Sequence, residues 1–499
     1  MEYRQVNLPS ASNPAADLFE RLNAAGIRYG AVTNARKIPA AMAGEGDLDV
    51  LVARDDYRRF CAMAAGCGGI RSVNHKSLVS PGREDWFVPD FDQGRYVHLD
   101  VHVALRLGGS FNKAYPFWRY GDIRDWQLES FDDCSIRIAS TEDQARIALS
   151  RIAFQAADFA LGRWQRLGGK WAKKLDPLLF PLGAAGERIV SYPSDGSELQ
   201  CRVRKCDGDI QVRRADLAKL RHLVRARCLA PPHAKATDPV IDAVRTVRYA
   251  GARALNRIWP GCTIDRRRPA SGGLVVAVIA PDGMGKTTQV RRMRRLFEWK
   301  FSCAAIYLGT GDGEGWRIRR LIRSAYMKRR SRVRAALVED ARAENCAPSF
   351  KKRMRSLLLG AWGILVALER YASIRKTRRM ADRGFIVFCD RWPQDIQPGL
   401  MDGPTRSAGH GSPGRLRTWE LSLYRRMALT QPDVSVQLVG SYATSQIRKP
   451  GELSREEFDK RMVLMEELRE RFPGICVLDA DRDVDAVSRS LFRLIWSAL

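Results

Sequence analysis

Short apolar runs and helical periods alternate in the C-terminal part of the chain. The β-branched, apolar run at 274–279 predicts a buried strand that leads into a loop and a helix. A later amphipathic period predicts a closing helix at 484–499, and further strands are expected at 303–308, 385–389, 434–439 and 474–478. This order is typical of an α/β fold with a parallel sheet and flanking helices, in which ligands bind at the carboxyl ends of the strands.

The N-terminal part mixes shorter strands and helices. Alternating polar and apolar positions predict strands at 46–52 and 96–105, and side chains two residues apart share one face of a strand. The polar faces of these strands carry Asp47, Asp49, His98, Asp100 and His102. A helical period follows from 141 to about 178, so we expect an α+β domain over residues 1–180.

The stretch 181–270 is polar, basic and interrupted by prolines. We predict a basic helical connector there. We predict a linker at 266–273, where this stretch meets the next domain. That segment is charged, contains a proline and ends in two glycines. The third predicted domain then covers 271–499. No internal repeat or low-complexity tract is present.

Composition narrows the class of protein. The 499 residues include 45% hydrophobic and 28% charged residues, as in globular proteins. The apolar run 357–368 is too short to span a bilayer, and the first residues lack a basic-then-apolar leader. The eleven cysteines are scattered without a Cys-x-x-Cys spacing, which is typical of reduced thiols. We therefore expect a cytoplasmic protein, with a homodimer left open as its oligomeric state.

The net charge of +28 suggests an anionic partner, but an arginine-rich composition alone explains it equally well. Positive charge is densest in the segment 317–334. One interpretation is an amphipathic surface for an anionic membrane or a nucleic acid. The interpretation that we favour is an exposed helical insertion near the phosphate site, because no nucleic-acid-binding motif accompanies the segment.

A glycine loop between the predicted strand at 274–279 and the next helix carries the strongest chemical signal. Backbone N–H groups of such a loop bind phosphate, and the helix N-terminus adds its positive dipole. Lys286 is placed to reach the β- and γ-phosphates of ATP, and the Thr287 hydroxyl to bind Mg²⁺. Ala280 stands where the usual pattern has its first glycine. The predicted nucleotide-binding residues are Gly283, Met284, Gly285, Lys286, Thr287 and Thr288.

Three further features suit phosphoryl transfer. Asp390 and Arg391 follow the predicted strand 385–389, where an acid can serve a metal ion and an arginine can hold phosphate. Arg370 ends the predicted helix at 357–370, and for this residue alone a helix-end cation is an equally plain interpretation. The basic loop that starts at Arg448 has the composition of a mobile lid.

Residues 274–499 resemble the thymidylate kinase-like family of P-loop kinases, on the motifs at 281–288, 368–370, 389–392 and 477–481 together with Arg448. The resemblance implies that Asp282 contacts the acceptor, that Arg370 and Arg391 hold its phosphate, and that Asp390 serves Mg²⁺. It also places Arg448 in the lid and residues near Asp479 beside the adenine. The segment 392–404 resembles a branch met near bacterial surface-polysaccharide genes, so the acceptor implied is a nucleoside monophosphate or a sugar-type compound.

Residues 15–160 resemble the nucleotidyltransferase superfamily through Asp47, Asp49 and Asp100, which in that family hold Mg²⁺. The segment 29–34 lacks the glycine pair expected for holding a triphosphate. The main hypothesis is therefore an ATP- and Mg²⁺-dependent kinase that acts on a small-molecule acceptor. Two alternatives stay open: a nucleotidyltransferase with a nucleotide-sensing P-loop half, and an ATP-switched protein that binds nucleic acid or a membrane surface.

Overall fold

The computed structural model divides between Ala270 and Ser271 into two compact units, which are described separately. It describes residues 13–74, 82–107, 115–155, 164–167, 169–181, 184–194, 197–227, 232–258, 267–309, 350–405 and 414–499. The basic segment 317–334, predicted to form a surface helix, lies outside the described residues.

The C-terminal unit is built on a parallel sheet of five described strands in the order β16-β17-β15-β18-β19. The central strand β15 is buried along its whole length, as its unbroken apolar run predicts. The five strands predicted in this unit are thereby confirmed, with shifts of one or two residues at their ends. Their bounds are β15 Leu274–Ile279, β16 Cys303–Tyr307, β17 Ile386–Asp390, β18 Val434–Val439 and β19 Cys476–Asp479.

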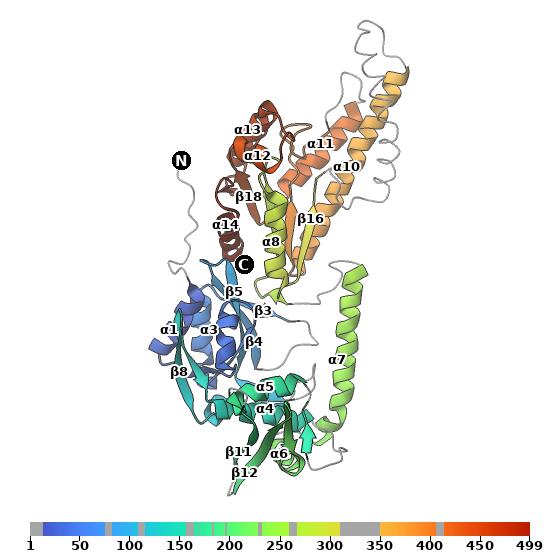
Figure 1. Ribbon diagram of the computed structural model, residues 1–499. Coiled ribbons are helices and arrows are strands. Elements are labelled where there is room, and N and C mark those ends of the chain that lie inside the picture. Colours follow the sequence, from blue (N-terminus) through green and yellow to red (C-terminus); the bar gives the residue numbers. More distant parts are fainter. Residues whose placement is uncertain are drawn as a thin grey trace. The chain divides into compact units, whose positions relative to one another are not determined.

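Helices pack on this sheet (Figure 1). The first helix after β15 and the last helix of the chain pack together, with the Phe297 ring 5.8 Å from Phe492 and 6.1 Å from Trp496 between ring centroids. The long helix α10 contacts β15 and β17, and α11 packs against α10. The helix bounds are α8 Lys286–Glu298, α10 Phe350–Asp382, α11 Gly414–Leu429, α12 Tyr442–Arg448, α13 Arg455–Arg471 and α14 Val484–Ser497.

The N-terminal unit begins with a mixed sheet of eight described strands in the order β14-β3-β4-β5-β2-β1-β9-β8. Strands β2 and β5 run parallel, and their register sets Asp49 beside Asp100. The sheet strands are β1 Tyr29–Ala31, β2 Asp47–Val52, β3 Ile70–Val73, β4 Arg83–Asp90, β5 Arg95–His102, β8 Trp126–Phe131, β9 Cys134–Ala139 and β14 Arg268–Pro269. The other elements are α1 Pro14–Ala24, α2 Ile38–Met42, α3 Tyr57–Gly66, the pair β6 Ala104–Leu107 and β7 Tyr115–Arg119, and 3-10 turns Ala35–Lys37, Arg54–Asp56 and Tyr120–Asp122.

The prediction of a helical connector over 181–270 is wrong for its first part, which forms strands of an antiparallel sheet ordered β10-β13-β12-β11. Val203 and Val212 face the core while Arg202 and Arg204 alternate with Val203, so the period is two residues. The alternation was missed in the sequence because arginines occupy many of the outward-facing positions. Strand β10 also interrupts the helical segment predicted at 141–178. The bounds are α4 Thr141–Gln155, β10 Trp164–Arg166, α5 Gly169–Leu179, β11 Gly186–Ser194, β12 Ser197–Cys206, β13 Asp209–Arg213, α6 Arg214–Arg227 and α7 Pro232–Ile258.

The predicted linker 266–273 is only partly a linker. Arg268 and Pro269 form β14, which pairs antiparallel with β3 in the N-terminal sheet. The preceding Arg267 makes an ion pair of 2.9 Å with Asp85 of β4. The N-terminal unit therefore extends to the end of this short strand.

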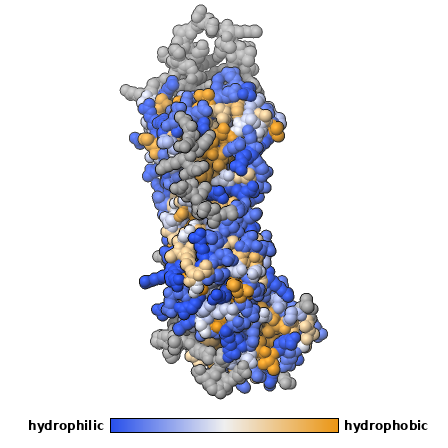
Figure 2. Space-filling model, turned by 90° about the vertical axis from the view of Figure 1, so that its left-hand side faces the viewer, coloured by the Kyte–Doolittle hydropathy of each residue, from blue (hydrophilic) through white to orange (hydrophobic). Residues whose placement is uncertain are grey.

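Hydrophilic residues cover most of the face shown in Figure 2, with hydrophobic residues in separate patches. This distribution agrees with the 28% of charged residues in the sequence. Among the described helices, none combines the length and the apolar character needed to cross a membrane.

Candidate functional site: a P-loop with converging cations

The loop between β15 and α8 has the backbone that phosphate binding requires. Gly283 and Gly285 both have φ of 87°, a left-handed conformation that favours glycine. A Cβ on Gly283 would lie 2.8 Å from the Ser445 hydroxyl oxygen, so a side chain does not fit there. Met284 is buried, and Gly285 is the N-cap of α8. The amides at this helix start can therefore face an anion together with the positive end of the helix dipole.

Lys286 is the first residue of α8, and its side chain is only 5% exposed. Its ammonium group donates a hydrogen bond of 2.7 Å to the Pro281 carbonyl and lies 3.3 Å from the Asp282 carboxylate. Burial lowers the pKa of Lys286 to about 8, with the nearby Arg391 acting in the same direction and Asp282 opposing it. The ammonium group is thus poorly solvated, and a bound phosphate would supply the negative charge that stabilises its protonated form.

Thr287 and Asp390 lie together, one at the start of α8 and the other at the end of β17. The Thr287 hydroxyl donates a hydrogen bond of 2.6 Å to one Asp390 oxygen. The second Asp390 oxygen is buried and has no hydrogen-bond partner among the described residues. Hydroxyl and carboxylate oxygens are the ligands that Mg²⁺ prefers, so this pair fits the predicted metal site. The neighbouring Thr288 is exposed.

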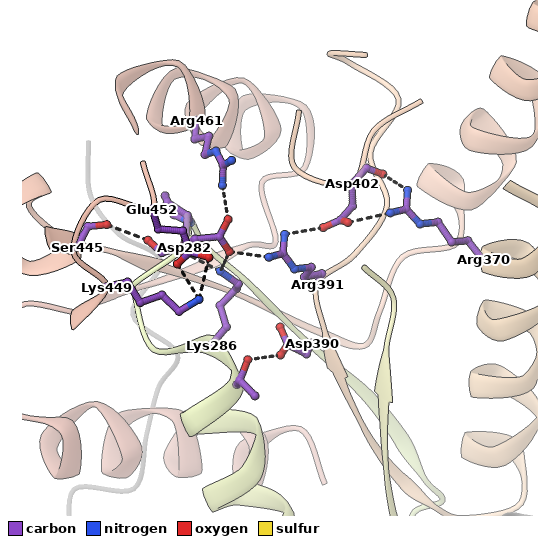
Figure 3. Close-up of polar contacts among 12 residues, drawn as sticks. Asp282, Lys286, Arg370, Asp390, Arg391, Asp402, Ser445, Lys449, Glu452 and Arg461 are labelled. Carbon is purple, nitrogen blue, oxygen red and sulfur yellow. Dashed lines mark hydrogen bonds and ion pairs between the residues drawn. The ribbon is translucent and has the colours of Figure 1, made fainter. Parts of the chain in front are cut away.

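The Asp282 carboxylate is the centre of the site (Figure 3). One oxygen lies 2.6 Å from the Arg391 guanidinium and 3.3 Å from Lys286. The other oxygen lies 2.5 Å from the guanidinium of Arg461, on α13. Burial alone would raise the pKa of Asp282, but these three cations together lower it well below its usual range. Three cations thus converge on one carboxylate beside the P-loop.

Asp402 joins the two arginines that were predicted to hold the acceptor. Its carboxylate lies 3.1 Å from Arg391 and 2.8 Å from Arg370. Arg370 also donates a 2.6 Å hydrogen bond to the Tyr424 hydroxyl and is only 3% exposed. The helix-end interpretation of Arg370 is wrong, because α10 continues for three further turns to Asp382.

Two residues of this cluster have unusual backbones. Arg391 has φ of 76° and Asp402 has φ of 66°, a left-handed conformation that residues other than glycine rarely adopt. Such strain persists where the surrounding structure holds it, and it is concentrated at functional sites. In this protein both members of the Arg391–Asp402 ion pair have this strained backbone.

Arg448 ends α12 and lies beside the P-loop, since a Cβ on Gly285 would be 3.8 Å from its guanidinium. It donates a hydrogen bond of 2.8 Å to the carbonyl of Ala480, which follows β19. Asp481 in turn accepts a hydrogen bond of 2.9 Å from the Ser441 amide. Arg448 therefore joins the P-loop side of the site to the segment after β19.

The structure brings some of the predicted N-terminal site residues together. Oxygen or nitrogen atoms of Asp49, Asp100 and His102 lie within 4.8 Å of one another. The Asp47 carboxylate lies instead 2.8 Å from one ring nitrogen of His98. The other ring nitrogen of His98 lies 2.7 Å from the buried carboxylate of Asp85, on β4. The predicted set is thus divided into one group of three residues and the Asp47–His98 pair.

An arginine pairs with one of the carboxylates that the prediction assigned to metal. Arg83 contacts both Asp100 oxygens at 2.6 Å. Burial alone would raise the pKa of Asp100, but His102 and Arg83 hold it well below its usual range. Asp85 behaves similarly, with His98 and Arg267 lowering its pKa against the effect of burial. Arg83 thus bonds to both Asp100 oxygens, while Asp49, Asp100 and His102 remain a candidate metal-binding group among the described residues.

Comparison with known proteins adds a limited likeness. No family model matches the chain. Over 193 residues the chain is 29% identical to the uncharacterized ATP-binding protein YghR of Escherichia coli K12, covering 37% of this chain and 73% of YghR. YghR of Escherichia coli O6:H1 matches to the same extent. A thymidylate kinase from Candida albicans has 14% sequence identity over 45% of this chain and 92% of its own, and its TM-score of 0.28 is too low to carry an argument.

Sequence reasoning missed several members of both clusters. Arg461 lies within the charged helix α13, where its neighbours Arg455 and Lys460 form ordinary i,i+4 pairs. Nothing in the sequence distinguishes it from them. Arg83 could have been noticed, because it lies on the polar face of β4. Arg267 could not, since it comes from the predicted linker.

Proposed function

We propose that the C-terminal unit is an ATP- and Mg²⁺-dependent phosphotransferase that acts on a small acceptor, either a nucleoside monophosphate or a sugar-type compound. The observation that carries this proposal is the convergence of Lys286, Arg391 and Arg461 on one carboxylate beside the P-loop. A site with this excess of positive charge at the carboxyl edge of a parallel sheet suits a phosphate group. The likeness to a protein named as ATP-binding supports the same assignment.

The P-loop residues 283–288 would hold the phosphates of ATP through backbone amides, with Lys286 placed between the β- and γ-phosphates. Thr287 and Asp390 would hold Mg²⁺, because their oxygens already lie 2.6 Å apart. The bound ion would neutralise charge on the phosphate oxygens. Arg448 would act from the lid, on the side of the segment after β19.

The acceptor would lie on the side of Asp282, Arg370 and Arg391. Arg391 is the residue that links the two halves of the site, since it contacts both Asp282 and Asp402. Arg370 is held in place by Asp402 and Tyr424. We propose that Arg391 orients the acceptor and that Arg370 fixes the end of the acceptor site away from the P-loop. A role in surface-polysaccharide synthesis rests on the sequence resemblance alone.

The test is acceptor-dependent release of ADP by the purified full-length chain. Wild type and Lys286→Ala are incubated with MgATP and a panel of nucleoside monophosphates and sugars. We expect one acceptor to stimulate ADP release by wild type and not by Lys286→Ala, whose fold is checked by its melting curve. Equal ADP release by the two proteins would refute the proposal.

A second candidate function is nucleotidyl transfer by the N-terminal unit, with the P-loop half sensing nucleotide. The observation in its favour is the grouping of Asp49, Asp100 and His102. The pairing of Arg83 with Asp100 weighs against it. This candidate predicts pyrophosphate release that is lost in Asp49→Asn, which phosphoryl transfer does not predict.

A further inference from the structure

Arg461 occupies a place in the site that no sequence motif assigns. It is the seventh residue of α13, outside both the P-loop and the basic loop that follows Arg448. Its side chain is 19% exposed and reaches Asp282, which lies 179 positions earlier in the chain. Figure 3 shows it approaching this carboxylate from the opposite side to Lys286.

The charges around Asp282 are unequal. One carboxylate cannot balance Lys286, Arg391 and Arg461, and among the residues that the structure describes only Arg391 has a second carboxylate, Asp402, at hydrogen-bond distance. The Nε atoms of Arg391 and Arg461 are buried and have no hydrogen-bond partner among the described residues. Buried donors without partners cost free energy unless a ligand satisfies them. The unpartnered donors and the unbalanced charge therefore favour an anion at this point.

The position identifies which anion. Lys286 belongs to the P-loop side, and Arg391 reaches towards the acceptor side through Asp402. A group that Lys286, Arg391 and Arg461 contact together must lie between the two sides. During phosphoryl transfer the γ-phosphoryl group lies there, with three non-bridging oxygens that carry negative charge.

We propose that Arg461 binds the γ-phosphate of ATP, and that the Asp282 carboxylate holds its guanidinium in position before the nucleotide arrives. The inference rests on the proposed function of the C-terminal unit and adds a residue to it. It makes Arg461 a sensor of the third phosphate: it distinguishes ATP from ADP, whereas the P-loop amides bind both nucleotides.

The experiment compares nucleotide affinities by calorimetry on the full-length chain. Wild type, Arg461→Ala and the control Arg469→Ala are each titrated with the magnesium complexes of ADP and of the non-hydrolysable analogue AMP-PNP. Arg469 lies on the same helix and pairs with Glu466 at 3.4 Å. We expect Arg461→Ala to weaken AMP-PNP binding about 10-fold or more, as for a lost hydrogen bond to a charged group, with ADP binding changed less than about threefold. The control should bind both nucleotides as wild type does.

A double-mutant cycle separates direct binding from an effect through Asp282. In an Asp282→Asn background, where the Asn side-chain oxygen can still accept a hydrogen bond from the guanidinium, Arg461→Ala should still weaken AMP-PNP binding selectively. Loss of the effect in that background would reduce Arg461 to a residue that only holds Asp282, and equal losses for ADP and AMP-PNP would also overturn the inference. If wild type binds neither nucleotide, the proposed function itself fails. If wild type binds both nucleotides and Arg461→Ala binds them with the same affinities, the inference alone fails.

Discussion

The two units each gather aspartates and arginines on a sheet, but with opposite excess charge. In the C-terminal unit, three cations surround Asp282. In the N-terminal unit, Asp47, Asp49, Asp85 and Asp100 share a face with two arginines and two histidines. The first cluster has positive charge to spare for an anionic ligand. In the second cluster, the arginines form ion pairs with the cluster's own carboxylates.

This difference shows that motif residues do not define a site by themselves. The polar face that carries the Asp47-x-Asp49 pair also holds Arg83, which pairs with Asp100 on the neighbouring strand and competes with a metal ion for that carboxylate. The P-loop lysine, in contrast, has a pKa that burial and the nearby Arg391 lower, and it shares its one carboxylate with two arginines. We therefore expect charge removal to cost activity in the C-terminal unit and stability in the N-terminal unit.

The largest expected effect is on catalysis by Arg391→Gly. Removing this guanidinium should lower acceptor-dependent ADP release about a thousandfold, as for arginines that neutralise a transferring phosphoryl group. The melting temperature should change little, because glycine suits the φ of 76° at this position. The matched control is Arg378→Ala, which removes an ion pair with Asp433 elsewhere in the unit. An Arg391→Gly protein that lost stability and kept its activity would contradict the proposed difference between the two units.

The next effect concerns stability and the Arg83–Asp100 pair. Arg83→Ala leaves a buried carboxylate without its bidentate partner, so the free energy of unfolding of the N-terminal unit should fall by about 3 kcal/mol. Urea denaturation measures this loss, and replacing both partners with Arg83→Met and Asp100→Asn should recover much of it. Nucleotide binding should not change. A stable Arg83→Ala protein with altered nucleotide affinity would contradict the assignment of this pair to stability.

A smaller effect is expected from pH. In the free protein the pKa of Lys286 is about 8, and bound phosphate should raise it, so AMP-PNP affinity should fall about tenfold between pH 7 and pH 9. The unfolded chain keeps this proton up to its ordinary pKa of 10.5, so the contribution of Lys286 to stability should begin to rise within this range and continue to rise to about pH 10.5. Calorimetry across this range tests the first statement, with Lys286→Arg expected to give a flat profile. A sloping profile in that variant would assign the proton to another group.

The smallest effect is expected at an exposed pair. Arg455 and Asp459 lie 3.0 Å apart on α13, with side chains 70% and 53% exposed. Arg455→Ala should therefore leave the free energy of unfolding within about 0.5 kcal/mol of wild type, because water screens such pairs. A loss as large as that of Arg83→Ala would show that exposure does not separate the two kinds of arginine.

The fold was predictable where hydrophobic pattern and chain order agree. The run 274–279 and the four later apolar runs correspond to strands β15 to β19, because the strands of a parallel sheet covered by helices carry mostly apolar sequences. Strands β11 to β13 were not predicted, since arginines on their outer face resemble a polar helix in composition. The pairing of β14 with β3 joins residues almost 200 positions apart, which no local pattern indicates.

The candidate site was predictable where residues follow each other in one motif. The P-loop, Asp390 and Arg391 are positioned by their own strand ends, and the structure brings them together with Asp282. The roles of Asp402 and Arg461 depend on how separate segments return to the same sheet edge. Tertiary packing alone supplies that information, as it does for Arg83 in the other unit.

The central claim is that chemistry on ATP belongs to the C-terminal unit. Its most direct test measures ADP and pyrophosphate separately during incubation of wild type, Lys286→Ala and Asp49→Asn with MgATP and the acceptor panel. We predict acceptor-dependent ADP release that is lost only in Lys286→Ala, with no pyrophosphate. Pyrophosphate release that is lost in Asp49→Asn and retained in Lys286→Ala would contradict the account and assign the chemistry to the N-terminal unit.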